Sequence, residues 1–172
     1  ITINTRITGK INIHVTLRFA GDIDNPTARE FAEQLARIDI RCFSMRLKGL
    51  GSFGGSEPRA IWAGIEAGPE LDELARATEK AARLAGLRPE TRTFVPHVTL
   101  ARLKHSRDDA VARLLGRHAA FRSPDIFVGR FVLYSSKPLV GGGPYVVEDG
   151  FPLAGGHYGD DFGDEAGQDP RW

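Results

Sequence analysis

Apolar and polar positions alternate over residues 11–19, where one parity is apolar and the other is polar or charged. The apolar members are Ile11, Ile13, Val15 and Leu17. A period of two residues is that of a strand with one buried face, so the pattern predicts a half-buried strand. Apolar runs bounded by turn-forming residues predict further strands over residues 42–50, 60–68, 92–104, 126–137 and 144–153.

A helical period replaces this alternation elsewhere in the chain. Apolar side chains recur at helical spacing in segments 26–38 and 70–87, which predicts two amphipathic helices. Ser106, with Asp109 three residues later, fits the start of a third helix. The first ten residues, ITINTRITGK, can supply one more strand. Helices and strands interleave with short connections, which favours an α+β fold with a largely antiparallel sheet.

Length and composition favour one domain with a short tail. A chain of 172 residues is long enough for a single core, which we place in residues 1–156. Residues 157–172 are rich in Gly and Asp and poor in apolar side chains, so we expect a disordered acidic tail. That tail carries five acids and one arginine, so the net charge of +1 leaves residues 1–156 at +5. This modest charge suits a small anionic ligand and falls short of a protein that coats nucleic acid.

Hydropathy and cysteine content exclude two further classes. No apolar run approaches the roughly 20 residues that span a bilayer, so no membrane segment is predicted. The first residues lack the apolar core of a signal peptide, and Cys42 has no second cysteine with which to form a disulfide. We therefore expect a cytoplasmic protein that acts as a monomer.

The tetrapeptide HVTL occurs twice, at residues 14–17 and again at residues 97–100, 83 residues later. Each copy lies in a predicted strand that a predicted helix follows, which suggests two related half-domains. Side chains two residues apart share one face of a strand, so each half presents one imidazole and one hydroxyl. These side chains are His14 and Thr16 in the first copy and His97 and Thr99 in the second.

Two imidazoles and two hydroxyls that meet in one cleft fit in-line displacement at phosphorus. A neutral imidazole acts as general base on the attacking oxygen, while a protonated one acts as general acid toward the leaving oxygen. Threonine hydroxyls can hydrogen-bond the non-bridging oxygens, where negative charge builds up. Such a site requires no metal, and the paired histidines lack a cysteine or carboxylate at ligand spacing, which disfavours zinc.

The paired His-x-Thr-x motifs resemble those of the two-histidine phosphoesterase superfamily. Further segments are similar to its RNA 2′,3′-cyclic phosphodiesterase branch, also called LigT-type 2′-5′ RNA ligases: HVTLRFAGDID, GLGSFGG, RAIWAGIE, FVPHVTLARLK and GGGPYVVEDGFPL. The similarity, over about residues 11–154, implies a bilobal, pseudo-two-fold fold with two largely antiparallel sheets flanked by helices around a central cleft. The family has a strand and a helix before the first motif, whereas 13 residues precede His14 here, so the first lobe is expected to lack them.

The resemblance also implies a reaction and a role for each site residue. The reaction opens a terminal RNA 2′,3′-cyclic phosphate to a 2′-phosphate, with His14 as proton donor to the leaving 3′ oxygen and His97 as proton acceptor from water. Thr16 and Thr99 would bind the phosphate, as would Arg102, which matches the family's arginine five residues after the second histidine. With an RNA 5′-hydroxyl in place of water, the site would form a 2′-5′ linkage without ATP. Neither a cofactor nor a metal is implied.

Two arginines near the motifs differ in parity. An offset of five residues puts Arg102 on the face opposite His97 in an ideal strand, so a bulge or the end of the strand has to redirect it. Arg18 has the parity of His14 and is expected to face the cleft. The resemblance implies no role for Arg18.

Alternatives to this interpretation stay open. The catalytic groups do not identify the rest of the substrate, so another small cyclic nucleotide or an ADP-ribose cyclic phosphate is an alternative substrate. A non-catalytic module that binds RNA ends is an alternative from another class. Gly49, Gly51 and Gly54 have dinucleotide-fingerprint spacing, but a strand rather than a helix follows them, which favours a loop between antiparallel strands. Phe53 in that loop is a candidate for contact with a base.

Overall fold

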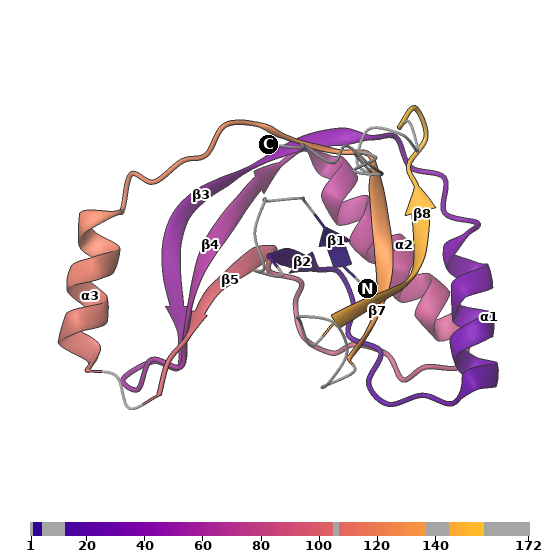
Figure 1. Cartoon of the computed structure of the whole chain (residues 1–172), viewed down its shortest axis with the longest axis horizontal. Coiled ribbons are helices and arrows are strands. Elements are labelled where there is room, and N and C mark those ends of the chain that lie inside the picture. The colour runs from indigo at the N-terminus through magenta and orange to yellow at the C-terminus, as the bar shows by residue number, and fades with distance from the viewer. Residues whose placement is uncertain (1, 5–12, 105–106, 137–144, 157–172) are drawn as a thin grey trace, which may run out of the picture.

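The computed structural model describes residues 2–4, 13–104, 107–136 and 145–156 (Figure 1). These residues form three helices and eight strands. The helices are α1 (Asn25–Leu35), α2 (Pro69–Leu84) and α3 (Asp108–Arg117). The strands are β1 (Thr2–Asn4), β2 (His14–Thr16), β3 (Phe43–Phe53), β4 (Ala60–Ala67), β5 (His97–Arg102), β6 (Ile126–Val128), β7 (Arg130–Ser136) and β8 (Tyr145–Pro152). The predicted acidic tail, residues 157–172, lies outside the described residues.

The strands pair into one sheet in the order β6-β3-β4-β5-β2-β1-β7-β8, and every neighbouring pair is antiparallel. β5 and β2, which carry the two HVTL copies, are neighbours within it. The β3–β4 hairpin flanks β5 on one side, and the β7–β8 hairpin lies beyond β2 and β1 on the other (Figure 1). The expected α+β fold is thereby confirmed, and its two expected sheets are continuous through the β2–β5 pair.

α1 and α2 cover one face of this sheet because their apolar stripes pack against it. The buried members of the two stripes are Phe31 and Leu35 in α1 and Leu71, Leu74, Ala75, Ala81 and Ala82 in α2. Val15 of β2 and Val98 of β5 belong to the same core. Residues of the other parity on β2 and β5 therefore point away from the helices. None of the helices in the described ranges is both long enough and apolar enough to span a bilayer.

Four predicted strands differ from the observed ones. The strand predicted over 92–104 is observed only as β5, from His97 to Arg102, and the strand predicted over 126–137 is divided into β6 and β7 between Val128 and Arg130. β2 ends at Thr16, because the chain turns away from the sheet and Arg18 points back toward α2. β3 continues to Phe53, into the glycine-rich segment that the sequence suggested as a loop, so the loop to the antiparallel β4 is limited to residues 54–59. A Cβ at Gly51 would lie 2.2 Å from Cζ2 of Trp62 on the neighbouring strand. Glycine at this position therefore leaves room for the indole ring above β3.

The strand predicted within the first ten residues is confirmed as β1. It pairs with β2 through Ile3 and Val15 and with β7 through Thr2 and Val132, so it joins the two. α3 begins after Arg107. The predicted cap of this helix, residue 106, and the first two residues of the predicted 11–19 strand lie outside the described residues.

Candidate active site

The register of β2 against β5 brings four predicted site residues together on one face of the sheet. Val15 lies opposite Val98, and both valines are buried in the core. Because the two strands are antiparallel, the residues that flank Val15 lie opposite the residues that flank Val98. The opposed pairs are therefore His14 with Thr99 and Thr16 with His97.

This register also determines how the functional groups are spaced. Directly opposed residues of antiparallel strands have Cβ atoms about 4.5–5.5 Å apart, and diagonal neighbours are about 7–8 Å apart. The two imidazoles occupy one diagonal and the two hydroxyls the other, so an anion between the imidazoles meets a hydroxyl on either side. Thr16 is exposed and both histidines are half-buried, so the face is open to a ligand. Across residues 2–4, 13–104, 107–136 and 145–156, no three His, Cys, Asp or Glu side chains gather as a metal-binding group.

A backbone contact of His97 determines which ring nitrogen carries its hydrogen. Nδ1 of His97 lies 2.7 Å from the carbonyl oxygen of Val95. A carbonyl oxygen only accepts hydrogen bonds, so Nδ1 is the protonated nitrogen of the neutral ring. Nε2 then has an available lone pair, which is what a general base requires.

Aromatic side chains from the β3–β4 hairpin surround the His97 ring. Phe53 meets it edge to face, with ring centroids 4.9 Å apart, and Trp62 lies 6.1 Å away. Phe53 and Trp62 also contact each other, at 5.4 Å and a tilt of 34°. We call these two residues the Phe53–Trp62 pair.

Tyrosines from the β7–β8 hairpin surround the His14 ring in a similar way. Tyr145 lies 5.2 Å from it and Tyr134 lies 6.3 Å from it, and both contacts are edge to face. We call these residues the Tyr134–Tyr145 pair. The sequence did not indicate the tyrosines or Trp62 as site residues, because only the pairing and curvature of the strands bring them to the histidines.

β5 has a bulge immediately after Thr99. Two consecutive residues of β4, Ile61 and Trp62, pair with Ala101 and Thr99, so Leu100 is an extra residue on β5. Such an insertion shifts the alternation of side chains by one position for the rest of the strand.

The bulge turns Arg102 to the site face. Arg102 pairs with Ala60, which shares the face of Trp62 because the two are two residues apart on β4. Trp62 in turn pairs with Thr99, so Arg102 lies on the face that carries Thr99 and His97. Arg102 is an exposed residue there. The conflict between the five-residue offset and the parity of a strand is thus resolved by one inserted residue.

Arg18, which its parity predicted in the cleft, is buried elsewhere. Its Nε lies 2.6 Å from Oε2 of Glu79, and its terminal nitrogens donate to the carbonyl oxygens of Phe19 and Arg88. Glu79 also accepts a hydrogen bond from the backbone N–H of Glu90, at 3.1 Å. The parity prediction was wrong for Arg18 because β2 ends before this residue, and strand alternation no longer applies.

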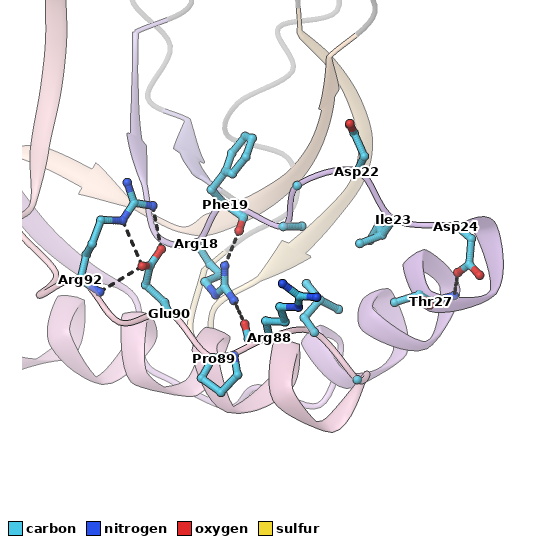
Figure 2. A pocket seen from close by; sticks show the side chains of 14 residues that line it. Arg18, Phe19, Asp22, Ile23, Asp24, Thr27, Arg88, Pro89, Glu90 and Arg92 are labelled. Carbon is cyan, nitrogen blue, oxygen red and sulfur yellow. Dashed lines mark hydrogen bonds and ion pairs between the residues drawn. The ribbon is translucent and has the colours of Figure 1, made fainter.

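A cavity of about 700 Å³ lies beside this ion pair, where β2 leads into α1 and α2 leads toward β5 (Figure 2). None of the five predicted site residues lines it. Figure 2 shows Arg92 bonded to Glu90 at its edge, and these hydrogen bonds lower the pKa of Glu90 to about 2. The cavity therefore lies between the segments that follow β2 and α2, whereas the predicted catalytic and phosphate-binding residues lie on the β2–β5 face.

The chain belongs to the LigT-like phosphoesterase family. The profile of this family, described as LigT like Phosphoesterase, matches residues 3–62 and 65–145. The match covers most of the chain and both HVTL copies, so the resemblance drawn from the paired motifs is confirmed.

Curated relatives carry a common name. A protein of Aeropyrum pernix called RNA 2′,3′-cyclic phosphodiesterase is 41% identical over 107 residues, which are 60% of this chain and 61% of that protein. A protein of Aquifex aeolicus with the same name is 32% identical over 149 residues, 84% of this chain and 79% of that protein. This chain thus matches less than two thirds of the first relative's length and more than three quarters of the second's.

Solved structures share the fold. LigT of E. coli, crystallised with 3′-AMP, superposes with a TM-score of 0.64 at 23% identity, over 88% of this chain and 83% of that one. Protein TT0787 of Thermus thermophilus also has a TM-score of 0.64, at 24% identity, over 84% and 80% of the two chains. The architecture expected for a two-histidine phosphoesterase is therefore confirmed.

Proposed function

We propose that this protein hydrolyses the 2′,3′-cyclic phosphate at an RNA end to a 2′-phosphate and a free 3′-hydroxyl. The observation that carries the proposal is the register of β2 and β5, which opposes each histidine with a threonine on one open face. The names of the Aeropyrum pernix and Aquifex aeolicus relatives support the choice of substrate.

In the proposed reaction, the two histidines move one proton each. His97 takes a proton from water at Nε2, the nitrogen that its Nδ1 contact with Val95 leaves available. The water oxygen attacks phosphorus, the bond from phosphorus to the 3′ oxygen breaks, and His14 donates a proton to that leaving oxygen. The 2′ oxygen keeps the phosphate, and the two histidines end with their protonation states exchanged.

Three further side chains bind the phosphate in this proposal. Thr16 and Thr99 donate hydrogen bonds to its non-bridging oxygens from the diagonal that crosses the one between the imidazoles. Arg102 adds a positive charge from the same face, where the bulge in β5 turns it. Donors aimed at oxygens on which charge develops stabilise the transition state more than the ground state.

We further propose that the site works without metal or cofactor in a cytoplasmic monomer. The mechanism moves two protons between histidines and water and needs no group beyond the side chains named above. With an RNA 5′-hydroxyl in place of water, the same proton transfers would join two RNA ends through a 2′-5′ linkage. The reverse step would open that linkage.

The test is product analysis on RNA that ends in a 2′,3′-cyclic phosphate. The wild-type chain should yield the 2′-phosphate, and His97→Ala should lower the rate by about 10²–10⁴-fold. His118→Ala is the matched control, because His118 is an exposed residue at the end of α3, and its rate should equal the wild type. Equal rates for wild type and His97→Ala would refute the enzymatic function and favour a module that only binds RNA ends.

Two additional measurements delimit the proposal. Rates in EDTA should match rates in buffer, and loss of turnover that a divalent ion restores would contradict metal independence. Small cyclic nucleotides and ADP-ribose cyclic phosphate, assayed beside RNA, define the substrate. If one of these small molecules has a higher kcat/KM than RNA, that molecule rather than RNA is the preferred substrate.

A further inference from the structure

The two aromatic pairs lie on opposite sides of the motif strands. The Phe53–Trp62 pair comes from β3 and β4, which lie on the side of β5 away from β2, and it contacts His97. The Tyr134–Tyr145 pair comes from β7 and β8, beyond β2 and β1, and it contacts His14. Each proton-transferring group of the proposed reaction thus has its own aromatic neighbours.

In-line displacement determines which part of the substrate lies beside each aromatic pair. The attacking and leaving oxygens lie on opposite sides of phosphorus. In the proposed function, His97 activates the attacking oxygen and His14 protonates the leaving 3′ oxygen. The nucleoside that carries the cyclic phosphate therefore extends toward His14, and whatever carries the attacking oxygen approaches past His97.

We infer that the Phe53–Trp62 pair binds the nucleobase of a second nucleoside, the one whose 5′-hydroxyl replaces water as the attacking group. This inference rests on the proposed function, because it takes the role of His97 from it. The 5′ oxygen bonds to phosphorus, the bond to the 3′ oxygen breaks, and the 5′-hydroxyl proton passes to Nε2 of His97. His14 protonates the 3′ oxygen, so the product is a 2′-5′ phosphodiester.

The Phe53 ring is arranged to receive a flat ligand. Phe53 is 42% exposed although its ring contacts both the His97 and the Trp62 rings. It meets the imidazole at an interplanar angle of 80°, and its exposed fraction shows that part of its surface stays uncovered beside His97. Nucleobases stack on such exposed aromatic rings with little dependence on sequence.

Neighbouring residues hold the pair in this position. Trp62 supports Phe53 from one side, and the indole itself lies over Gly51, where any Cβ would collide with it. Beyond Phe53, Gly54 has a φ of 115°, a backbone conformation that disfavours a side chain. The chain therefore turns sharply next to Phe53 and leaves its ring at the edge of the site face.

The experiment measures how the donor 2′,3′-cyclic AMP divides between hydrolysis and transfer to an added acceptor. The two acceptors are adenosine and methyl riboside, which has the same 5′-hydroxyl and no base. Phe53→Leu should lower the ratio of adenosine transfer to hydrolysis about tenfold, the size expected for one base stacked on one ring. The corresponding ratio for methyl riboside should stay as in the wild type. Phe127→Leu, a 58% exposed phenylalanine on β6, is the matched control and should change neither ratio.

Two outcomes would overturn the inference while hydrolysis itself persists. Phe53→Leu could lower hydrolysis of cyclic AMP and adenosine transfer by the same factor, which would assign the ring to the donor base. Alternatively, the wild type could transfer to adenosine no better than to methyl riboside, which would show that no acceptor base binds.

A binding measurement separates this inference from failure of the proposed function. In a Trp172→Phe background, Trp62 is the single tryptophan, so quenching of its fluorescence reports binding beside it. Adenosine should quench and methyl riboside should not, and Phe53→Leu should weaken the adenosine effect about tenfold. Quenching without any hydrolysis of cyclic phosphates would refute the proposed function alone. Absent quenching would refute the base site alone.

Discussion

The two HVTL strands share four residues and differ in the arginine that follows. After β2 this residue is Arg18, which lies beyond the end of the strand, is buried and pairs with the half-buried Glu79 of α2. In β5 it is Arg102, which the bulge turns to the site face. One copy of the motif thus contributes its arginine to the fold, and the other contributes a cation beside the histidines. A single extra residue, Leu100, accounts for the orientation of Arg102.

The largest effects should come from the histidines, and they should differ in kind. His14→Gln and His97→Gln should each lower kcat by about 10²–10⁴-fold. A bell-shaped pH profile should lose its acidic limb in His97→Gln, because that limb reports a base, and its alkaline limb in His14→Gln, because that limb reports an acid. Rates across pH 5–9 measure this. Loss of the same limb in both variants would contradict the opposite roles.

The next effect concerns the arginine of the second strand. Arg102→Ala should lower kcat/KM by about 10²–10³-fold, the size typical of one lost donor to a developing oxyanion. Deletion of Leu100 removes the bulge and moves Arg102 to the other face of the sheet, so it should lower kcat/KM by a similar factor. Steady-state kinetics on a cyclic-phosphate substrate measures both.

A matched control tests the bulge itself. Leu100→Ala keeps the inserted residue and changes only its exposed side chain, so its kinetics should equal the wild type. Thermal melting establishes that the deletion variant is folded before its kinetics are compared. A folded deletion variant with wild-type kcat/KM would show that the orientation of Arg102 has no part in the reaction.

The arginine of the first strand should affect stability instead. Arg18→Met leaves Glu79 without its ion-pair partner and should lower the free energy of unfolding by about 2–3 kcal/mol. Removal of one partner from a fully buried pair costs more, and the Glu79 side chain is 27% exposed. Urea unfolding measures the change, and the pH profile of turnover should keep both limbs. A lost limb at unchanged stability would assign Arg18 to the site.

The smallest effect should come from Glu90, which bonds to Glu79 through its backbone. Arg92 holds the pKa of Glu90 at about 2, below its usual 4.5, principally through a side-chain hydrogen bond. A carboxyl with a lowered pKa stabilises the folded state above its usual pKa and loses this contribution as pH falls toward the lowered value. Glu90→Gln should therefore lower the melting temperature slightly at pH 6 and leave it unchanged near pH 2. Salt should shrink the difference at pH 6, because the pair is exposed, and an equal shift at both pH values would contradict this account.

The sequence predicted those parts of the molecule that repeat regularly. Helical spacing identified α1 and α2, and strand alternation placed Val15 in the core with His14 and Thr16 on the other face. The repeated tetrapeptide then indicated the second half of the site. An identical motif in a similar predicted strand is expected to point its His and Thr side chains to the same face of the sheet.

The features that the sequence did not predict arise where regularity ends. Strand parity placed Arg18 in the cleft, but β2 stops before it, and a half-buried carboxylate on α2 determines its position instead. The bulge at Leu100 is a single-residue event that no periodicity encodes. Apart from Phe53, which the sequence indicated as a candidate for base contact, the aromatic neighbours of the histidines are Trp62, Tyr134 and Tyr145. They come from hairpins distant in sequence, so only the pairing of the strands brings them to the site.

The continuity of the sheet through β2 and β5 bears on how this protein can evolve. The spacing of the two imidazoles depends on hydrogen bonds between two adjacent strands, not on the docking of separate bodies. The β3–β4 and β7–β8 hairpins carry the aromatic side chains around the two imidazoles, but they do not determine the distance between the imidazoles. Mutations there can alter which molecules are accepted while the distance between the reacting groups is inherited unchanged.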